Sequence, residues 1–206
     1  MPQAPPPTLS TRAAAATAPP WRGPPVPGAI ALTGGVPWAG ILPAAALGEA
    51  FKSVLDRPDA GFTALPYHHS EGTDELRAWI AAEQGADPAQ VLVTNGALHS
   101  VALVLESLID PGDLIVTEDP TYPLALGLFR HYGAQVAAVP VDAGGFDVNA
   151  FRDQLRGGLR PKLVYLIPDF QNPSGVTLTA ERRAELLELA DRYGFVVISD
   201  NPYRQL

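Results

Sequence analysis

The 206-residue sequence contains no cysteine, and this absence removes several classes of protein. Without thiols there is no disulfide framework, no thiolate nucleophile and no thiolate metal site. Basic residues are also outnumbered, since 14 lysines and arginines face 22 acids and the formal charge is −8. Because nucleic-acid binders need a basic surface, this balance argues against a nucleic-acid partner.

Long apolar runs are missing as well. The most apolar stretch, residues 100–109, is interrupted by Glu106 and is too short to cross a bilayer. The N-terminus lacks the basic start and apolar core of a signal peptide. We therefore expect a cytoplasmic protein that does not associate with a membrane.

Proline, by contrast, is concentrated at one end of the chain. Residues 1–28 hold nine of the 22 prolines together with an alanine cluster. Such a segment cannot bury a core, so we predict a disordered tail or linker there. Order is expected to begin with an N-terminal arm over residues 29–74.

From about residue 75, short apolar runs alternate with amphipathic stretches. Strands are predicted at residues 91–94, 114–118, 135–141, 163–168 and 196–200. Helices are predicted at residues 74–84, 97–109, 124–133, 147–155 and 179–194. This alternation is typical of an α/β fold with a mostly parallel sheet and helices on both faces.

Two of these helices carry recognisable signals. Asp147 and Thr179 stand at the expected starts of the last two helices, where such side chains cap free amides. The apolar side of the last helix is predicted to consist of Leu186, Leu187 and Ala190.

Ligands of open α/β sheets lie beyond the carboxyl ends of the strands, and polar stretches follow the predicted strands at those points. After the first strand, Gly96 and Ala97 open a helix whose amides could hold an anion such as phosphate. Tyr122 could stack on a planar ligand, and Asn172 could donate to a ligand oxygen. Each stretch alone also fits a plainer role, as a turn, a packed ring or an amide that caps its own loop.

Asp200 directly follows the last predicted strand. A carboxylate at the inner end of a buried strand is costly unless a partner pairs with it. The surrounding DNPY lacks the further acids or histidines that a metal needs. A protonated heterocyclic nitrogen would suit this acid, and the plainer alternative is an aspartate that caps the next element.

Taken together, seven stretches resemble the class I/II aminotransferases, which are fold-type I pyridoxal-phosphate enzymes. In chain order these are GGVP, Y-x4-G-x3-LR from Tyr67 to Arg77, TNGA, DPGD, EDPTYP, QNPSG and DNPY. The resemblance runs from about residue 29 to the end, and the last motifs are most similar to the 2-aminoadipate and multi-substrate branch. It implies that residues 29–74 include part of a small domain, and that 75–206 form a truncated domain binding pyridoxal 5'-phosphate (PLP).

The resemblance also implies a set of ring contacts. Asp200 would pair with the pyridine nitrogen of PLP and make the ring an electron sink. Tyr203 and Asn172 would hydrogen-bond the phenolic oxygen of the ring. Tyr122 would stack on the ring face.

Further contacts implied by the resemblance concern the phosphate and the substrate. The amides of Gly96 and Ala97 would hold the phosphate, and Tyr67 would reach the phosphate of the neighbouring subunit in a homodimer. Gly35 would lie near the substrate carboxylate. The substrates would be an amino acid and a 2-oxo acid.

Several positions depart from the family pattern. Leu98 and His99 stand where this branch commonly has glutamines, and His68 stands where a glycine is common. We interpret His68 and His69 as loop residues rather than catalysts.

The largest departure is a missing lysine. The family's reaction needs a lysine that forms a Schiff base with the cofactor and moves a proton. The chain contains only Lys52 and Lys162, and neither is predicted at the carboxyl end of a strand. No catalytic residue is therefore assigned within this chain.

Two interpretations of the missing lysine remain open: the N-terminal half of an aminotransferase, or a non-catalytic remnant or partner module with the same fold. A nucleotide-binding domain fits poorly, because no G-x-G-x-x-G or G-x4-G-K-[ST] motif follows the first strand.

Overall fold

The computed structural model describes residues 8–14, 27–28, 30, 35 and 37–205. The chain divides into two compact units, Pro20–Thr94 and Met1–Pro19 with Asn95–Leu206. Most of the tail predicted over residues 1–28 lies outside the described residues. Within it, Thr11–Ala14 forms the short helix α1.

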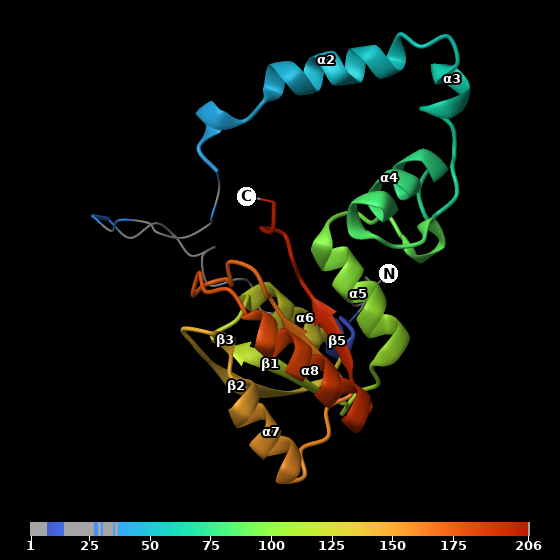
Figure 1. The fold of residues 1–206 in the computed structure, drawn as a ribbon. Coiled ribbons are helices and arrows are strands. Elements are labelled where there is room, and N and C mark those ends of the chain that lie inside the picture. The colour runs from blue at the N-terminus through green and yellow to red at the C-terminus, as the bar shows by residue number, and fades with distance from the viewer. Residues whose placement is uncertain (1–7, 15–26, 29, 31–34, 36, 206) are drawn as a thin grey trace. The chain divides into compact units, whose positions relative to one another are not determined.

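The unit Pro20–Thr94 is helical in its described part (Figure 1). Its elements are η2 (Ala39–Ile41), α2 (Ala44–Leu55), α3 (Ala60–Thr63), α4 (Asp74–Gln84) and η3 (Pro88–Gln90). The predicted helix at 74–84 is confirmed, and it begins where Thr73 accepts a hydrogen bond from the Leu76 amide. α2 has no buried residue, and Leu47 and Phe51 on it are exposed.

The larger unit is built on a five-stranded sheet with the order β3-β2-β1-β4-β5. The strands are β1 (Leu114–Asp119), β2 (Gln135–Asp142), β3 (Gly145–Phe146), β4 (Leu163–Leu166) and β5 (Val196–Ser199). β1 pairs in parallel with β2 and β4, and β4 pairs in parallel with β5, whereas β3 is antiparallel to β2. The predicted α/β class and mostly parallel sheet are confirmed.

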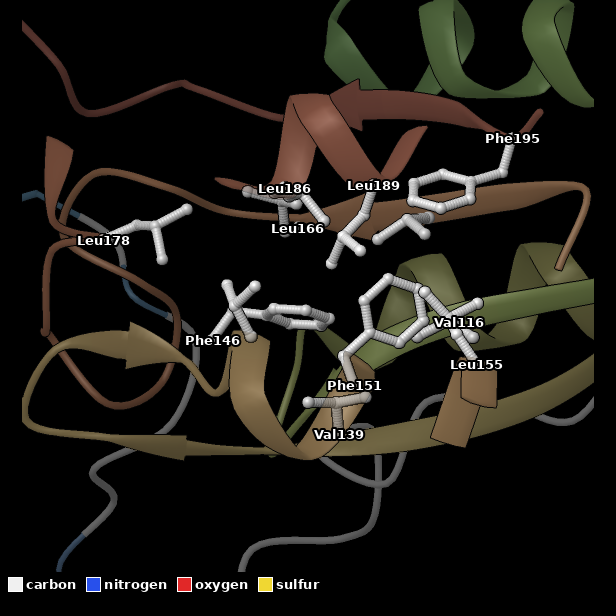
Figure 2. Close-up of a cluster of buried hydrophobic side chains, with 12 residues drawn as sticks. Val116, Val139, Phe146, Phe151, Leu155, Leu166, Leu178, Leu186, Leu189 and Phe195 are labelled. Atoms are coloured by element: carbon white, nitrogen blue, oxygen red, sulfur yellow. The ribbon is translucent and has the colours of Figure 1, made fainter. Parts of the chain in front are cut away.

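Helices cover both faces of this sheet (Figure 1). They are α5 (Ala97–Leu108), α6 (Pro123–His131), α7 (Val148–Arg156) and α8 (Ala180–Tyr193). On one face, Phe151 of α7 and Leu189 of α8 pack on Val116 and Val164 of the central strands (Figure 2). On the other face, Leu105 of α5 and Phe129 of α6 pack on the same two strands. Burial on both faces explains why the central strands are apolar throughout.

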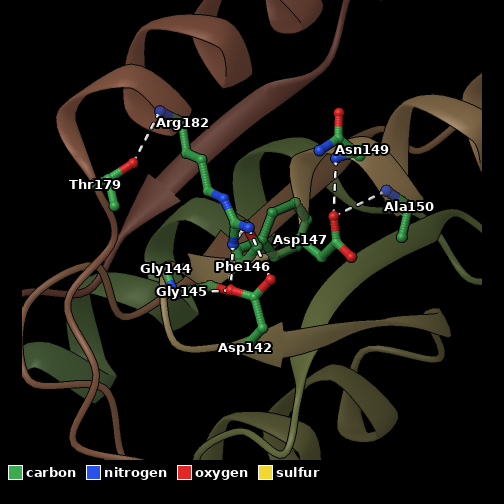
Figure 3. Close-up of polar contacts among 9 residues, drawn as sticks. All are labelled: Asp142, Gly144, Gly145, Phe146, Asp147, Asn149, Ala150, Thr179 and Arg182. Carbon is green, nitrogen blue, oxygen red and sulfur yellow. Dashed lines mark hydrogen bonds and ion pairs between the residues drawn. The ribbon is translucent and has the colours of Figure 1, made fainter.

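Polar contacts fix the ends of α7 and α8 (Figure 3). Asp147 caps α7 as predicted, because its carboxylate accepts from the amides of Asn149 and Ala150 at 3.0 and 3.1 Å. Thr179 caps α8 as predicted by accepting from the Arg182 amide. The Arg182 guanidinium in turn donates to both carboxylate oxygens of Asp142, at 2.6 and 2.7 Å, and so ties α8 to the β2–β3 hairpin.

One predicted strand is wrong: residues 91–94 form no strand. A strand needs a partner strand, and none of the described strands pairs with this segment. The Val93 amide donates to the Glu71 carbonyl at 2.9 Å, and the Arg77 side chain donates to the Val91 carbonyl at 3.0 Å. The apolar run VLV therefore stays irregular in the described chain.

The apolar side of α8 also differs from the prediction. Leu186 is buried, but Leu187 is 59% exposed and Leu189 takes its place against the sheet. Successive residues of a helix are rotated by about 100°, so residues 186 and 189 lie on the same face of α8, whereas residue 187 points away from that face.

This difference gives a matched pair of substitutions. In the protein that carries this chain, Leu186→Ala is expected to lower the free energy of unfolding by about 2–5 kcal/mol, because it opens a cavity in the core. Leu187→Ala is expected to change it by no more than about 0.5 kcal/mol. Denaturant unfolding of both variants measures the difference, and equal losses would show that the face of α8 has been assigned incorrectly.

Candidate functional site

Three loops meet at one edge of the sheet because β1, β4 and β5 run in parallel. Their carboxyl ends lead into EDPTYP, PDFQNPSG and DNPY. The topology therefore brings Tyr122, Asn172, Asp200 and Tyr203 to the same edge, where ligands of such sheets bind.

Asp200 is held by two bonds to β4. Its amide donates to the Leu166 carbonyl at 2.9 Å, which extends the pairing of β4 and β5 by one residue. Its Oδ2 accepts from the Tyr165 hydroxyl at 2.6 Å. The side chain is partly exposed, so its carboxylate is anchored from within the sheet and remains accessible to a ligand.

Tyr122 lies beside Asp200 and Tyr203. The pKa of its phenol is raised above the ordinary value, first by burial and then by the charges of Tyr203 and Asp200. Tyr122 immediately precedes α6 and packs partly against the core between α6 and the sheet. Its ring is therefore fixed on one side and partly accessible on the other.

A pocket of about 420 Å³ opens beside these residues. It is lined by Phe170, Gln171, Asn172, Pro173, Gly175 and Tyr203. The turn that carries Asn172 is closed by its neighbour, since Gln171 Oε1 accepts from the amide and the hydroxyl of Ser174 at 2.8 and 2.6 Å. Gln171 thus performs the capping role that was the plainer alternative for Asn172.

A buried polar network joins the loops after β1 and β4. Glu118, only 2% exposed, accepts from the Ile167 amide at 3.0 Å and from Gln171 Nε2 at 3.1 Å. Gln171 Nε2 also donates to the Pro120 carbonyl at 2.8 Å. Burial raises the pKa of Glu118 to about 7, against the lowering effect of the two donors.

A second network joins the loops after β4 and β5. Asp169 accepts from Arg183 Nη2 and from Asn201 Nδ2, each at 2.7 Å. The hydrogen bond from Arg183 is the main reason that the pKa of Asp169 is lowered from its ordinary value. Asn201 directly follows Asp200, so this network fixes the backbone on the far side of the acid.

Two buried oxygens at this edge have no hydrogen-bond partner within the part of the chain that the structure describes. They are Thr121 Oγ1 and Asn201 Oδ1, the direct sequence neighbours of Tyr122 and Asp200. Unsatisfied buried polar atoms are costly and are often completed by a ligand or water.

The predicted anion site lies at the start of α5. Gly96 precedes the helix with φ of 89°, a conformation that favours glycine, and Ala97 is its first residue. The first amides of a helix have no partner within it and so can bind an anion. His99 turns back on this loop, because its Nδ1 accepts from the Asn95 amide at 3.1 Å.

The remaining predicted residues and the two lysines belong to other segments of the chain. Gly35 and Tyr67 belong to the unit Pro20–Thr94, where Tyr67 is fully exposed. Lys52 lies on α2 of that unit and pairs with Asp56. Lys162 precedes β4 and pairs with Asp113 at 2.6 Å, at the edge of the sheet opposite the carboxyl ends.

Three residues at the site edge were not predicted from the sequence: Tyr165, Glu118 and Gln171. A signal existed for Glu118, since it is an acid inside the apolar run of β1. Tyr165 and Gln171 reach partners 35 and 53 residues away, and no local pattern indicates such contacts.

The raised pKa of Glu118 gives a pH prediction. Between the ordinary value of 4.5 and about 7, the folded protein keeps this proton while the unfolded chain releases it. The free energy of unfolding should therefore fall as pH rises through this window, by at most about 3 kcal/mol from this group.

Glu118→Gln, which can still accept both hydrogen bonds, should remove this component of the pH dependence. Unfolding measured across the window in wild type, Glu118→Gln and the exposed control Glu106→Gln tests it. A Glu118→Gln protein with the wild-type pH dependence would contradict the assignment.

The described residues form neither a metal-binding cluster nor a membrane-spanning helix. Within the ranges that the structure describes, no group of three or more histidines or acids could hold a metal ion. No described helix is long and apolar enough to cross a membrane.

Comparison with known proteins adds a family match. The family model for aminotransferase class I and II matches residues 43–206. The aromatic-amino-acid aminotransferase 1 of Thermococcus litoralis is 36% identical over an alignment of 187 residues, and the match covers 86% of this chain and 44% of that protein.

Two solved structures show the same similarity. The α-aminoadipate aminotransferase of Thermus thermophilus, solved with N-(5'-phosphopyridoxyl)-L-leucine, matches 84% of this chain at 35% identity and a TM-score of 0.77. The multiple substrate aminotransferase of Thermococcus profundus matches 95% at 29% identity and a TM-score of 0.85. The chain covers 44% and 51% of these two proteins, so it spans about half their length.

Proposed function

Because the chain belongs to the class I and II aminotransferases, whose cofactor is PLP, we propose that it forms the N-terminal half of an enzyme that transfers amino groups between an amino acid and a 2-oxo acid. The observation that carries this proposal is the meeting of Asp200, Tyr122, Asn172 and Tyr203 at the carboxyl edge of the sheet. Residues 75–206 would be the first part of the cofactor-binding domain. The similarity to the α-aminoadipate and multiple substrate enzymes supports a substrate of that branch.

The residues present fit PLP. The cofactor is a planar ring with a basic nitrogen, a phenolic oxygen and a phosphate, and this edge offers a carboxylate, an aromatic ring and an amide. Thr121 Oγ1 and Asn201 Oδ1, which have no partner in the described chain, flank the site and add polar atoms that a ligand could satisfy. The open pocket of about 420 Å³ lies within the size range of small-molecule sites.

When bound, PLP supplies the electron sink for breaking bonds at the substrate's α-carbon. The residues of this chain would hold and orient it. Asp200 would keep the proton on the ring nitrogen, because an ionised carboxylate stabilises a cationic partner. Tyr203 and Asn172 would hydrogen-bond the phenolic oxygen, and Tyr122 would cover one ring face.

The phosphate would bind at the start of α5, on the amides of Gly96 and Ala97. Gly35 would lie near the substrate carboxylate, and Tyr67 would reach the phosphate held by the partner subunit of a homodimer. The full exposure of Tyr67 is compatible with this role.

The lysine that transfers the proton would come from sequence beyond residue 206. Lys52 and Lys162 are each engaged by an aspartate, and Lys162 is at the opposite edge of the sheet. The lack of a suitable lysine among residues 1–206 also favours the second candidate, a non-catalytic module with this fold. The DNA downstream of codon 206 separates the two, since a continuing frame that encodes a lysine in a serine-rich strand supports the enzyme.

Absorbance spectroscopy tests the proposed activity directly. The protein that carries this chain should bind PLP with a band in the near-ultraviolet or visible range. An amino acid should shift that band, and a 2-oxo acid should restore it. A protein that binds no PLP would contradict the proposal.

The shared site predicts complementation between inactive subunits. A Tyr67→Phe subunit mixed with a subunit that carries Asp200→Ala should form hybrid dimers with partly restored activity, because one of their two sites is then intact. Activity assays of the mixture, with each variant alone as control, measure this. An active monomer on sedimentation, or no restoration, would count against the shared site.

A further inference from the structure

Tyr165 of β4 carries a hydroxyl group that its packing in the core does not require. Its side chain is fully buried, and its ring meets Phe129 edge-on at 5.3 Å between centroids. A phenylalanine would make the same apolar contacts. The hydroxyl therefore needs another explanation, and its partner in the structure is Asp200.

The hydrogen bond between these residues has the geometry of a strong one. Tyr165 Oη lies 2.6 Å from Asp200 Oδ2, a length typical of a hydroxyl donating to a carboxylate. The pKa of the Tyr165 phenol is raised well above its ordinary value. Burial is the main cause, and the hydrogen bond to Asp200 is the second. The phenol is therefore protonated at every working pH and can serve Asp200 only as a donor.

The other contacts around Asp200 leave the orientation of its carboxylate unfixed. The Asp200 amide is bonded to the Leu166 carbonyl, and the following residue, Asn201, is bonded to Asp169. These bonds fix the backbone but leave the carboxylate to rotate about its side-chain bonds. Tyr165 holds one of the two carboxylate oxygens from a rigid strand, and so determines where the other oxygen lies.

We propose that Tyr165 is a positioning residue that orients the Asp200 carboxylate toward the ring nitrogen of the cofactor. This inference rests on the proposed function, because it gives Asp200 the cofactor as its second partner. The register of the strands supports it, since Tyr165 pairs with Ile198 and so lies two residues before Asp200 on the neighbouring strand.

The test uses Tyr165→Phe in the full-length protein, with Tyr132→Phe as control. Tyr132 contacts the same apolar cluster but lies after the far end of α6. For Tyr165→Phe we expect PLP affinity and kcat each to fall about 10-fold, the scale of one lost hydrogen bond to a charged group. KM for the amino acid should change by less than about two-fold, since no substrate contact is lost. The control should match wild type.

Two further readouts separate positioning from mere packing. The pH at which the absorbance of the bound cofactor changes should shift by about half a unit or more in Tyr165→Phe. In an Asp200→Asn background, Tyr165→Phe should have little further effect on PLP affinity, because the two residues act through one contact.

The measurements distinguish failure of the positioning role from failure of the proposed function. Equal PLP affinity, kcat and pH behaviour in wild type and Tyr165→Phe would overturn the inference, and so would additive losses in the double variant. If wild type itself binds no PLP, the proposed function fails and this inference with it. Wild-type binding and turnover with an unaffected Tyr165→Phe would refute the positioning role alone.

Discussion

Replacing Asp200 with alanine is expected to abolish detectable transamination in the full-length protein while leaving PLP partly bound. Asp200 is the candidate at this edge for holding the ring proton, so its loss removes the electron sink. Removal of one pre-organised electrostatic group typically lowers kcat by about 100- to 1,000-fold or more. The amides at the start of α5 remain in the variant and should still hold the phosphate.

The measurement pairs turnover with cofactor content. Asp200→Ala is assayed for kcat and for PLP by absorbance, beside Asp191→Ala, which removes an exposed aspartate from α8. The control should behave as wild type in both assays. Near-normal turnover in Asp200→Ala would refute the role assigned to this acid.

Expressed alone, residues 1–206 are expected not to transaminate and to fold poorly. The chemical expectation follows from the lysines. Lys162 lies at the edge of the sheet opposite the carboxyl ends, and Lys52 lies on α2, where it pairs with Asp56. We therefore also expect Lys52→Ala and Lys162→Ala in the full-length protein to retain activity. Loss of activity in either variant would place the missing lysine within this chain.

The structural expectation follows from exposed apolar surface. β5 pairs only with β4 among the described strands, and Val196 on it is 45% exposed. α2 buries none of its residues, so Phe51 is left to solvent. Open edges and apolar faces of this kind associate with other chains. Because total stability is only about 5–15 kcal/mol, we expect aggregation.

Solubility, sedimentation and thermal melting of the 206-residue chain test this expectation, with the full-length protein as control. A monodisperse chain that melts cooperatively would contradict the structural half. Turnover of an amino acid by that chain would contradict the chemical half.

The parallel sheet could be predicted because its signals are local. The apolar runs of β1 and β4 are bounded by turn residues, and the caps at Asp147 and Thr179 mark where helices begin. The segment 91–94 carries the same apolar signal and forms no strand, since pairing depends on a neighbour that the segment itself cannot specify. Local pattern thus predicts strand-forming tendency, and tertiary structure decides its outcome.

In the candidate site, too, the local motifs could be recognised in the sequence, whereas the long-range contacts could not. The motifs named Asp200, Tyr122, Asn172 and Tyr203 as candidates, and the topology brings them to one edge because their loops follow parallel strands or open the next helix. The groups that hold this edge together were missed. Glu118 and Gln171 meet across 53 residues, so only the folded arrangement of β1 and β4 reveals their contact.

In the proposed site, the carboxyl edge of this sheet binds PLP through Asp200. A crystal structure of the full-length protein with PLP would show whether this contact forms. We predict that the ring nitrogen lies within hydrogen-bond distance of the Asp200 carboxylate, with Tyr122 stacked on the ring. A cofactor bound elsewhere, or a ring nitrogen paired with another group, would show that the proposed site is wrong.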